Sequence, residues 1–428
     1  MHVITNLKKN EIIPAGIIIL LFLAGQAPLQ NYIKGVRLMQ LLLILYAGFY
    51  FITRINRKRL LSTGKWIIFS ILLLIAYSLL GHGNTEQTMR LVSVYAFALS
   101  LFIIGFYWGE KSNLRVLNTI LLILFFITTL SIVPYVFSIA SEGLSGISKS
   151  YASEYFGVES AFIIYWPYVL ILGSISFAFV KYGPYSIMIK KVSTVLFFIF
   201  LASLIISAFT AVLIMLLIAF LVYGFIVYSR KSFIKAIVTF VFFSGFVILF
   251  LILISKGTFG ELGGTSYKIK SFVNVFDASS SQVDNLMMQT TSGRWDAFGL
   301  SLRSFFLTPI FGKGFIWITK LNRLSTIEVA SQHSSILDGL AYFGVFSLVI
   351  LMVYISFIKK SYSLLKLVSS QNDKKKIAIL FSVLVAHFTI NFMNPYFFTL
   401  IDNFIFFIGG FIAGYLSWID KQVVRQIK

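Results

Sequence analysis

The sequence predicts an all-α polytopic integral membrane protein with about 12 transmembrane helices, because apolar segments of membrane-spanning length recur along it. Hydrophobic residues are 58% of the 428 residues and charged residues are 12%, whereas soluble domains carry roughly 25% charged residues. The mean hydropathy is +0.90. A chain of this composition is not an ordinary soluble domain, and most of it belongs in hydrocarbon.

Each predicted helix is an apolar stretch close to the roughly 20 residues that cross about 30 Å of hydrocarbon. The expected spans are 12–29, 36–53, 66–80, 91–108, 116–138, 161–180, 192–207, 209–228, 233–254, 335–358, 377–393 and 397–418. The first span follows "NLKK" and is read as a retained helix, because the rest of the chain is polytopic.

Lys and Arg fall in short runs that occupy alternate connections between these spans. The runs are "RINRKR" (54–59), "KK" (190–191), "SRK" (229–231), "KK" (359–360) and "NDKKK" (372–376). Since loops rich in Lys and Arg stay on the cytoplasmic side, both termini are predicted to be cytoplasmic in a cell inner (plasma) membrane. The net charge of +21 is therefore a topology signal and not a sign of nucleic-acid binding.

The scarce residue types also limit the chemistry. The chain has no cysteine, so a disulfide, a thiolate nucleophile and a Cys-based metal site are excluded. The four histidines are scattered, and we expect neither a metal nor a cofactor. His387 and Asp402 lie at membrane depth near Asn391, where a functional site and a structural interhelical polar cluster are both open interpretations.

One outward connection, residues 255–334, has about 80 residues, whereas loops longer than about 12 to 15 residues are uncommon unless functional. It divides the chain into an N-terminal membrane bundle (1–254), a large extracytoplasmic loop (255–334) and a C-terminal membrane bundle (335–428). A second outward segment, 141–160, is polar and aromatic. We therefore expect the chemistry on the outer face.

Within the large loop, "TSGRWDAFGLSLRSFF" (291–306) predicts a short amphipathic helix in the membrane interface. Its apolar stripe consists of Trp295, Phe298, Leu302, Phe305 and Phe306. Asp296 and Arg303 share another face, and Arg294 lies in the first turn. The arginines either contact lipid phosphates as an interfacial anchor or clamp a pyrophosphate, since guanidinium offers a bidentate fork.

The next segment, "TPIFGKGF" (308–315), has glycines at positions 312 and 314 on either side of Lys313. Gly312 and Gly314 permit a tight turn and close backbone approach, and Lys313 adds a cation. The segment is weak evidence for a phosphate-binding loop, and a plain turn is the favoured interpretation.

His333 lies where a polar loop gives way to an apolar helix. Ser335 and Asp338 have the spacing of a capping box, which places the start of the helix at Ser335. If the helix starts at Ser331 instead, His333 lies in its first turn. The positive end of the helix dipole then disfavours the imidazolium, and a neutral imidazole can act as a general base. The alternative is an interfacial histidine bonded to the loop backbone.

Taken together, "SGRW" (292–295), "TPIFGKG" (308–314) and "QHSSILDGLAYFG" (332–344) resemble the O-antigen ligase and polymerase superfamily of membrane glycosyltransferases. In that family an SGR-type element, a Pro-x-x-Gly-x-Gly turn and a His-x-x-x-Leu element occur in this order. The layout of about 12 helices with one long outer loop before the tenth helix is also similar.

The resemblance implies a GT-C-like enzyme that catalyses an inverting, metal-independent transfer between undecaprenyl-pyrophosphate-linked oligosaccharides, one the donor and one the acceptor. His333 would deprotonate the attacking hydroxyl, while arginines, Arg294 first among them, would hold the leaving pyrophosphate. The other partners implied are the lipid bilayer and a chain-length regulator and flippase of the same pathway. The supporting residues expected are Gly312, Lys313, Gly314 and Asp338.

One element of the family pattern is missing. Many members carry a Ser-Arg pair before the eighth helix, but this sequence reads "IISAFTAV" (205–212) there. Arg90 or Arg303 is the candidate replacement for that arginine. His82, in an outer loop, is expected to line the acceptor path.

Three other functions remain open at this stage. A lipid-linked oligosaccharide flippase needs a charged central cavity, and the charge-poor helices argue against it. A pure scaffold for an assembly complex would need neither His333 nor Arg294. Within the transferases we favour a polymerase over an O-antigen-type ligase, which differs from it in the acceptor.

Overall fold

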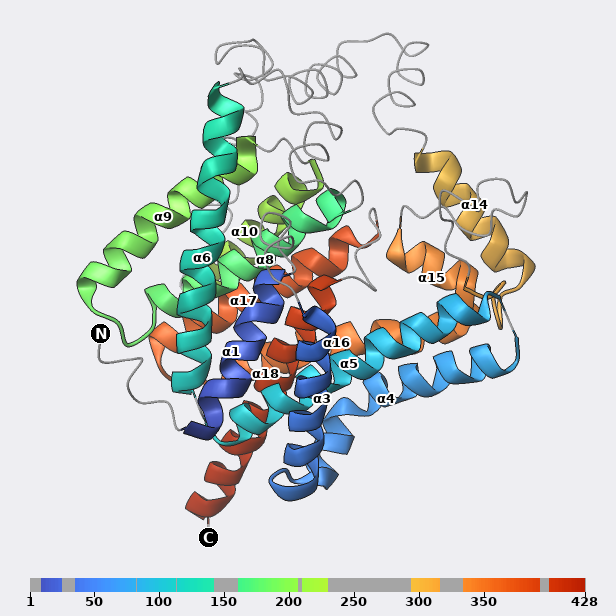
Figure 1. Cartoon of the computed structure of the whole chain (residues 1–428), viewed down its shortest axis with the longest axis horizontal. Helices are drawn as coiled ribbons and strands as arrows, with labels where there is room; N and C mark the ends of the chain where they lie inside the picture. The colour runs from blue at the N-terminus through green and yellow to red at the C-terminus, as the bar shows by residue number, and fades with distance from the viewer. Residues whose placement is uncertain are drawn as a thin grey trace.

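The computed structural model describes residues 9–24, 35–81, 83–112, 114–141, 161–206, 210–229, 294–315, 334–392 and 400–427. Nearly all of them are helical, and the helices pack into one bundle (Figure 1). In this part of the chain, six helices are long and apolar enough to cross a membrane. The prediction of an all-α membrane protein is confirmed at that level.

Each predicted span in the described part of the chain overlaps an observed helix, with ends that differ by up to nine residues. The helices outside the motif region are α1 (Lys9–Ala24), α3 (Val36–Thr53), α4 (Arg57–Leu79), α5 (Thr85–Glu110), α6 (Leu114–Ser141), α8 (Ala161–Lys181), α9 (Ile187–Ile206), α10 (Thr210–Ser229), α16 (Ser347–Leu367), α17 (Gln371–Ile390) and α18 (Leu400–Ile427). The part of the chain that holds the three sequence motifs, residues 292–344, contains α14 (Arg294–Leu307) and α15 (Ser335–Phe343). The predicted span 233–254 lies outside the described residues.

The predicted span 335–358 lies within one candidate membrane span, Ser335–Leu367, but its helix is interrupted. A 3₁₀ turn at Gly344–Phe346 separates α15 from α16, and α16 continues to Leu367. Apolar composition alone does not reveal this break, because both helices are apolar.

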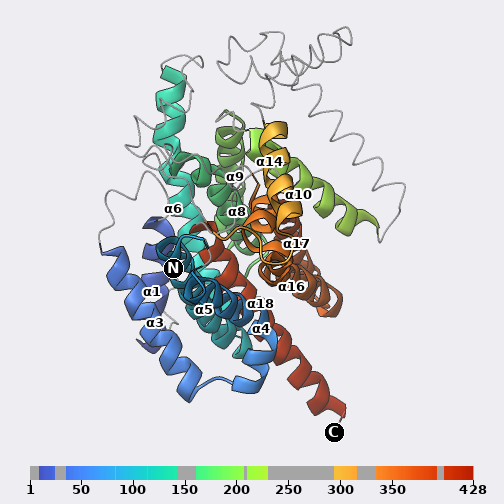
Figure 2. The ribbon, with the colours of Figure 1, turned by 90° about the vertical axis from the view of Figure 1, so that its right-hand side faces the viewer.

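Helices α5 and α18 pack most closely of all, and they lie side by side in both views (Figure 1, Figure 2). Each carries two glycines four residues apart, Gly105 and Gly109 on α5 and Gly410 and Gly414 on α18. A Cβ atom on Gly109 would lie 2.7 Å from the backbone nitrogen of Tyr415. Small residues at this spacing let membrane helices bring their backbones into contact, so this pair forms the centre of the bundle.

Two basic residues, Arg59 in the first turn of α4 and Lys421 near the end of α18, lie at one end of the bundle. Arg59 donates from Nη1 to the carbonyl oxygen of Ser417, at 2.8 Å. Lys421 Nζ lies 2.5 Å from Oε1 of Glu110. The start of α4 therefore meets the end of α18, and the end of α18 meets the end of α5. We call this the basic end and the opposite end, where α4 ends and α5 begins, the motif end.

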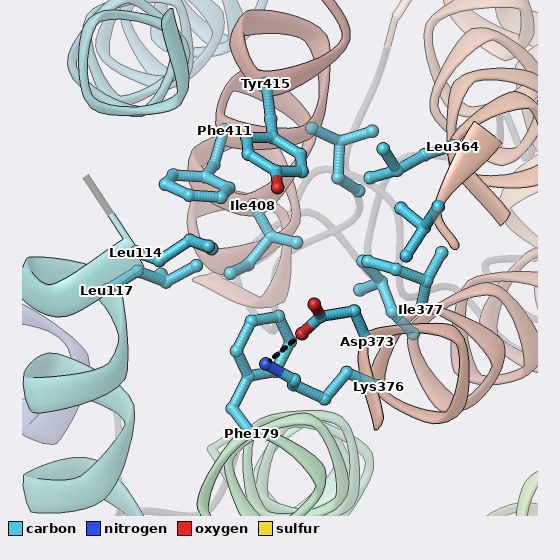
Figure 3. A pocket seen from close by; sticks show the side chains of 13 residues that line it. Leu114, Leu117, Phe179, Leu364, Asp373, Lys376, Ile377, Ile408, Phe411 and Tyr415 are labelled. Carbon is cyan, nitrogen blue, oxygen red and sulfur yellow. Dashed lines mark ion pairs between the residues drawn. The ribbon is translucent and has the colours of Figure 1, made fainter. Parts of the chain in front are cut away.

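A small cavity lies at the basic end, where α17 begins (Figure 3). The ion pair between Lys376 Nζ and Asp373 Oδ1, at 2.5 Å, borders it, and Lys376 lies over the ring of Phe179. The other lining residues are Leu114, Leu117, Leu364, Val368, Ile377, Leu380, Ile408, Phe411, Ile412 and Tyr415. Since α17 is roughly 30 Å long, this cavity is far from the motif end.

Candidate active site at the motif end

The turn after α14 fits into the break between α15 and α16. Gly344 has φ 57°, and a Cβ atom there would lie 2.5 Å from the carbonyl oxygen of Pro309. The backbone N–H of Val345 donates to that same oxygen at 2.8 Å. The helix breaks here because only glycine adopts this backbone conformation readily and lets the turn approach so closely.

The same turn completes the hydrogen bonding of the end of α15. The N–H groups of Lys313 and Gly314 donate to the carbonyl oxygens of Ala341 and Tyr342, each at 2.9 Å. These carbonyls belong to the last turn of the helix, which has no further helical N–H groups to bind them. Gly312, with φ 66°, brings the backbone into position.

These bonds bear on the two interpretations of the segment 308–315. The backbone amides of residues 313 and 314 are used within the fold, as the plain turn predicts. If this segment binds a phosphate, the binding group is the side chain of Lys313, which is half-buried.

The hairpin between α4 and α5 holds the other side of the turn. The hydroxyl of Tyr77 lies 2.7 Å from the carbonyl oxygen of Phe311 and 3.0 Å from that of Phe343. The N–H of Asn84 donates to the carbonyl oxygen of Phe315 at 2.9 Å. The first turns of α5 therefore belong to the motif end.

Arg90 lies on these first turns of α5. Its Nη2 atom is 2.6 Å from Oε1 of Glu86, and both side chains are exposed. Arg90 is thus on the same end of the bundle as the turn 308–315. An exposed i,i+4 pair of this kind is weak, so it leaves the guanidinium accessible to an anion.

Helix α14 packs against the protein through the face that contains Ser301 and Ser304. Ser301 and Ser304 are buried, whereas Phe306 and Leu307 are 73% and 64% exposed. Of the predicted apolar stripe, Leu302 and Phe306 are exposed and Phe298 and Phe305 are half-buried, so part of the stripe faces away from the protein, as expected of a helix in the membrane interface. Arg303 is exposed on α14. Arg294 is the first residue of the helix, and its side chain lies outside the described part.

The start of α15 corrects the predicted capping box by one residue. The N-cap is Ser334, not Ser335, and its Oγ atom accepts the N–H of Leu337 at 3.1 Å. Oδ2 of Asp338 accepts the N–H of Ser334 at 3.2 Å. The carboxylate that binds the N-cap N–H thus belongs to the fourth residue of the helix. In a capping box it belongs to the third.

Asp338 also binds the neighbouring helix. Its Oδ1 atom accepts a hydrogen bond from Oγ of Ser301 on α14, at 2.6 Å. Sequence reasoning missed Ser301. The spacing of the serines could have indicated it. Ser301 and Ser304 lie three residues apart, on the side of the helix away from Leu302 and Phe306.

The end of α17 forms a hydrogen bond with the N-cap residue of α15. Ser334 Oγ lies 3.2 Å from the carbonyl oxygen of Asn391, and the side-chain amide of Asn391 donates to the carbonyl oxygen of His387 at 2.7 Å. His387 is fully buried. This geometry favours the interhelical polar cluster as the interpretation of His387 and Asn391.

The motif end therefore joins four segments that are far apart in sequence: the first turns of α5, α14 with the turn that follows it, the start of α15 and the end of α17. His333, His82 and residues 207–209 lie outside the described residues. His333 immediately precedes Ser334 in the chain. Among the described residues, no group of His, Asp or Glu is arranged to hold a metal ion.

The fold and the membrane-length helices define the class of this chain, an all-helical membrane protein. No protein-family model matches the sequence, and no curated protein matches it.

Proposed function

We propose that this chain is a polysaccharide polymerase of the O-antigen or capsule type. It would be an inverting, metal-independent membrane glycosyltransferase that joins undecaprenyl-pyrophosphate-linked repeat units on the outer face of the membrane. One observation carries the proposal. The segments that hold the three sequence motifs pack at one end of the bundle, away from the basic loops.

The positions of the basic residues support the sidedness of this proposal. The start of α4, which belongs to the basic run 54–59, meets the end of α18 at the basic end, and Lys- and Arg-rich connections stay in the cytoplasm. The motif end then faces outward, in a cell inner (plasma) membrane with both termini in the cytoplasm. A lipid-linked donor already flipped to the outer leaflet would present its pyrophosphate at this level.

The residue types at the motif end suit transfer from a pyrophosphate leaving group. Negative charge develops on the pyrophosphate oxygen as the glycosidic bond breaks, so cations there stabilise the transition state more than the ground state. Arg294 and Arg303 on α14, Arg90 on α5 and Lys313 in the turn are the candidate cations. His333 takes the proton of the acceptor hydroxyl, and the acceptor path passes His82.

The test is deletion of the gene in its host, followed by gel and mass-spectrometric analysis of lipid-linked and surface glycans. The leaflet that holds the lipid-linked unit is measured in the same cells. A polymerase predicts single repeat units on lipid that face outward, and complementation by the wild-type gene restores the polymer.

Other patterns would identify other functions. Full-length polymer left on lipid would mean an O-antigen-type ligase, which shares the motifs and differs in its acceptor. Repeat units trapped on the cytoplasmic side would mean a flippase and would contradict the proposal.

A further inference from the structure

Asp338 is a buried carboxylate at the meeting point of two segments that the proposed function uses. Its residue is 4% exposed, while Ser301 and Ser334 are fully buried. A buried carboxylate is costly unless donors satisfy it. Oδ1 accepts from Ser301 and Oδ2 from Ser334, so the two oxygens reach two different segments.

The segment on the Ser301 side is α14. Arg294 begins this helix, seven residues before Ser301, which corresponds to about 10 Å along the helix axis. The apolar residues on the outer side of α14 are exposed, so its packing against the protein is on the serine side. A bond from Ser301 to α15 therefore restrains where the helix that carries Arg294 sits.

The segment on the Ser334 side is the start of α15. The N–H of Ser334 binds Asp338, its Oγ atom binds Leu337 and Asn391, and its carbonyl oxygen accepts the N–H of Asp338 at 2.9 Å. Every polar atom of Ser334 is thus held by the surrounding fold. His333 is the residue before Ser334 in the chain.

We propose that Asp338 is a positioning residue that clamps α14, the helix that begins at Arg294, to the first turn of α15, the helix that follows His333 in the chain. This inference rests on the proposed function, because it assigns the two sides of the clamp to the leaving-group cation and the general base. A displacement of about 1 Å between such groups is enough to slow a reaction roughly 10²-fold.

The chemistry of the clamp predicts which substitutions preserve it. An asparagine at position 338 keeps one oxygen acceptor for the N–H of Ser334. Its amide N–H can then donate to Ser301, because a hydroxyl rotates to accept. Alanine removes both bonds. A geometric role therefore predicts that Asp338→Asn retains most of the turnover and Asp338→Ala does not.

The experiment uses the purified full-length protein in nanodiscs with lipid-linked repeat units isolated from the deletion strain. We expect Asp338→Ala to lower the turnover by about 10²-fold and Ser301→Ala by roughly tenfold. The matched control is Ser304→Ala, which removes a second buried hydroxyl from the same face of α14 and should leave turnover unchanged. Ser301→Ala keeps the cap on Ser334, so it tests the clamp even where Asp338→Ala folds poorly.

A distance measurement separates positioning from a chemical role. Because the chain has no cysteine, spin labels can be attached at Leu307→Cys on α14 and Leu348→Cys on α16, both exposed positions. Asp338→Ala should broaden the distance distribution between the labels, and Asp338→Asn should not. Wild-type turnover in Asp338→Ala, or an inactive Asp338→Asn with unchanged distances, would overturn the positioning role.

The two proposals fail in different ways. If the wild-type protein makes no polymer, the proposed function is wrong, whatever the spin-label distances are. If His333→Ala is inactive while Asp338→Ala and Ser301→Ala turn over normally, the proposed function stands and the clamp is wrong.

Discussion

The hydroxyl of Tyr77, near the end of α4, lies 2.7 Å from the carbonyl oxygen of Phe311 in the turn after α14. The same hydroxyl is 3.0 Å from the carbonyl oxygen of Phe343 at the end of α15. One buried hydroxyl on α4 thus contacts two segments that lie more than two hundred residues later in the chain. Its neighbours are two backbone carbonyls that need donors in an apolar setting.

Tyr77→Phe should lower the free energy of unfolding by about 1–3 kcal/mol, because it removes the single hydroxyl proton that the two carbonyl oxygens share. Thermal unfolding of the purified protein in detergent measures the change. The control is Tyr362→Phe, at an exposed position on α16, which should have a much smaller effect. Equal stability of Tyr77→Phe and the wild type would mean that the hydroxyl does not support the turn.

The contact between α5 and α18 makes a second prediction. A Cβ atom on Gly109 would lie within 3 Å of the α18 backbone, so Gly109→Ala should destabilise the protein by about 1–3 kcal/mol through overpacking. Gly48 on α3 has open space around it. Gly48→Ala is therefore the matched control, and thermal unfolding should show no loss. A tolerated Gly109→Ala would contradict the close backbone contact.

The conformation of the turn at Gly312 leads to a third prediction. Its φ of 66° is unfavourable for alanine, and a Cβ atom would lie 2.6 Å from the backbone nitrogen of Gly344. Gly312→Ala should disturb the turn against α15 and reduce both stability and transfer. Gly299→Ala on α14, where there is open space, should leave both unchanged. Normal activity of Gly312→Ala would show that the turn is not needed in this conformation.

His333→Ala should preserve membrane expression and reduce transfer by about 10²- to 10⁴-fold, the usual contribution of a general base. The assay is polymer formation from lipid-linked repeat units by purified protein. His387→Ala is an informative comparison, because the buried His387 should matter for stability rather than for the chemical step. A fully active His333→Ala protein would contradict the general-base role.

Arg294→Lys keeps the positive charge but removes the bidentate fork, so transfer should fall while expression is maintained. The same substitution at Arg303 and Arg90 tests which further arginine contacts the pyrophosphate. The arginine that replaces the missing Ser-Arg element should show the larger loss of polymer yield. Wild-type yield from Arg294→Lys would indicate an anchoring contact with lipid phosphate.

Much of the fold could be predicted because helix formation in hydrocarbon depends on local composition. The predicted span 36–53 has the same bounds as α3, and the ends of the other described spans differ from the observed helix ends by up to nine residues. The break at Gly344 could not be predicted in this way, since it depends on a turn that is about 35 residues earlier in the chain. The glycine pairs of α5 and α18 are visible in the sequence, but their pairing spans about three hundred residues.

The site was predicted less completely. The capping box was placed one residue late because Asp338 reaches back from the fourth helical position, and Ser301 was missed because a serine in an amphipathic helix carries no signal of its partner. The bonds to Asn391 and Tyr77 come from helices far away in sequence.

The sequence by itself determined that this chain is helical and membrane-embedded, and it marked where Lys and Arg separate the spans. Hydrocarbon imposes these features residue by residue, since each segment must satisfy its own backbone and keep its charges out of the apolar core. Only the tertiary structure decided that Ser301, Asp338 and Ser334 meet, and that the 308–315 turn closes the end of α15. Such bonds form only after distant helices have packed, because their donors and acceptors lie on different segments.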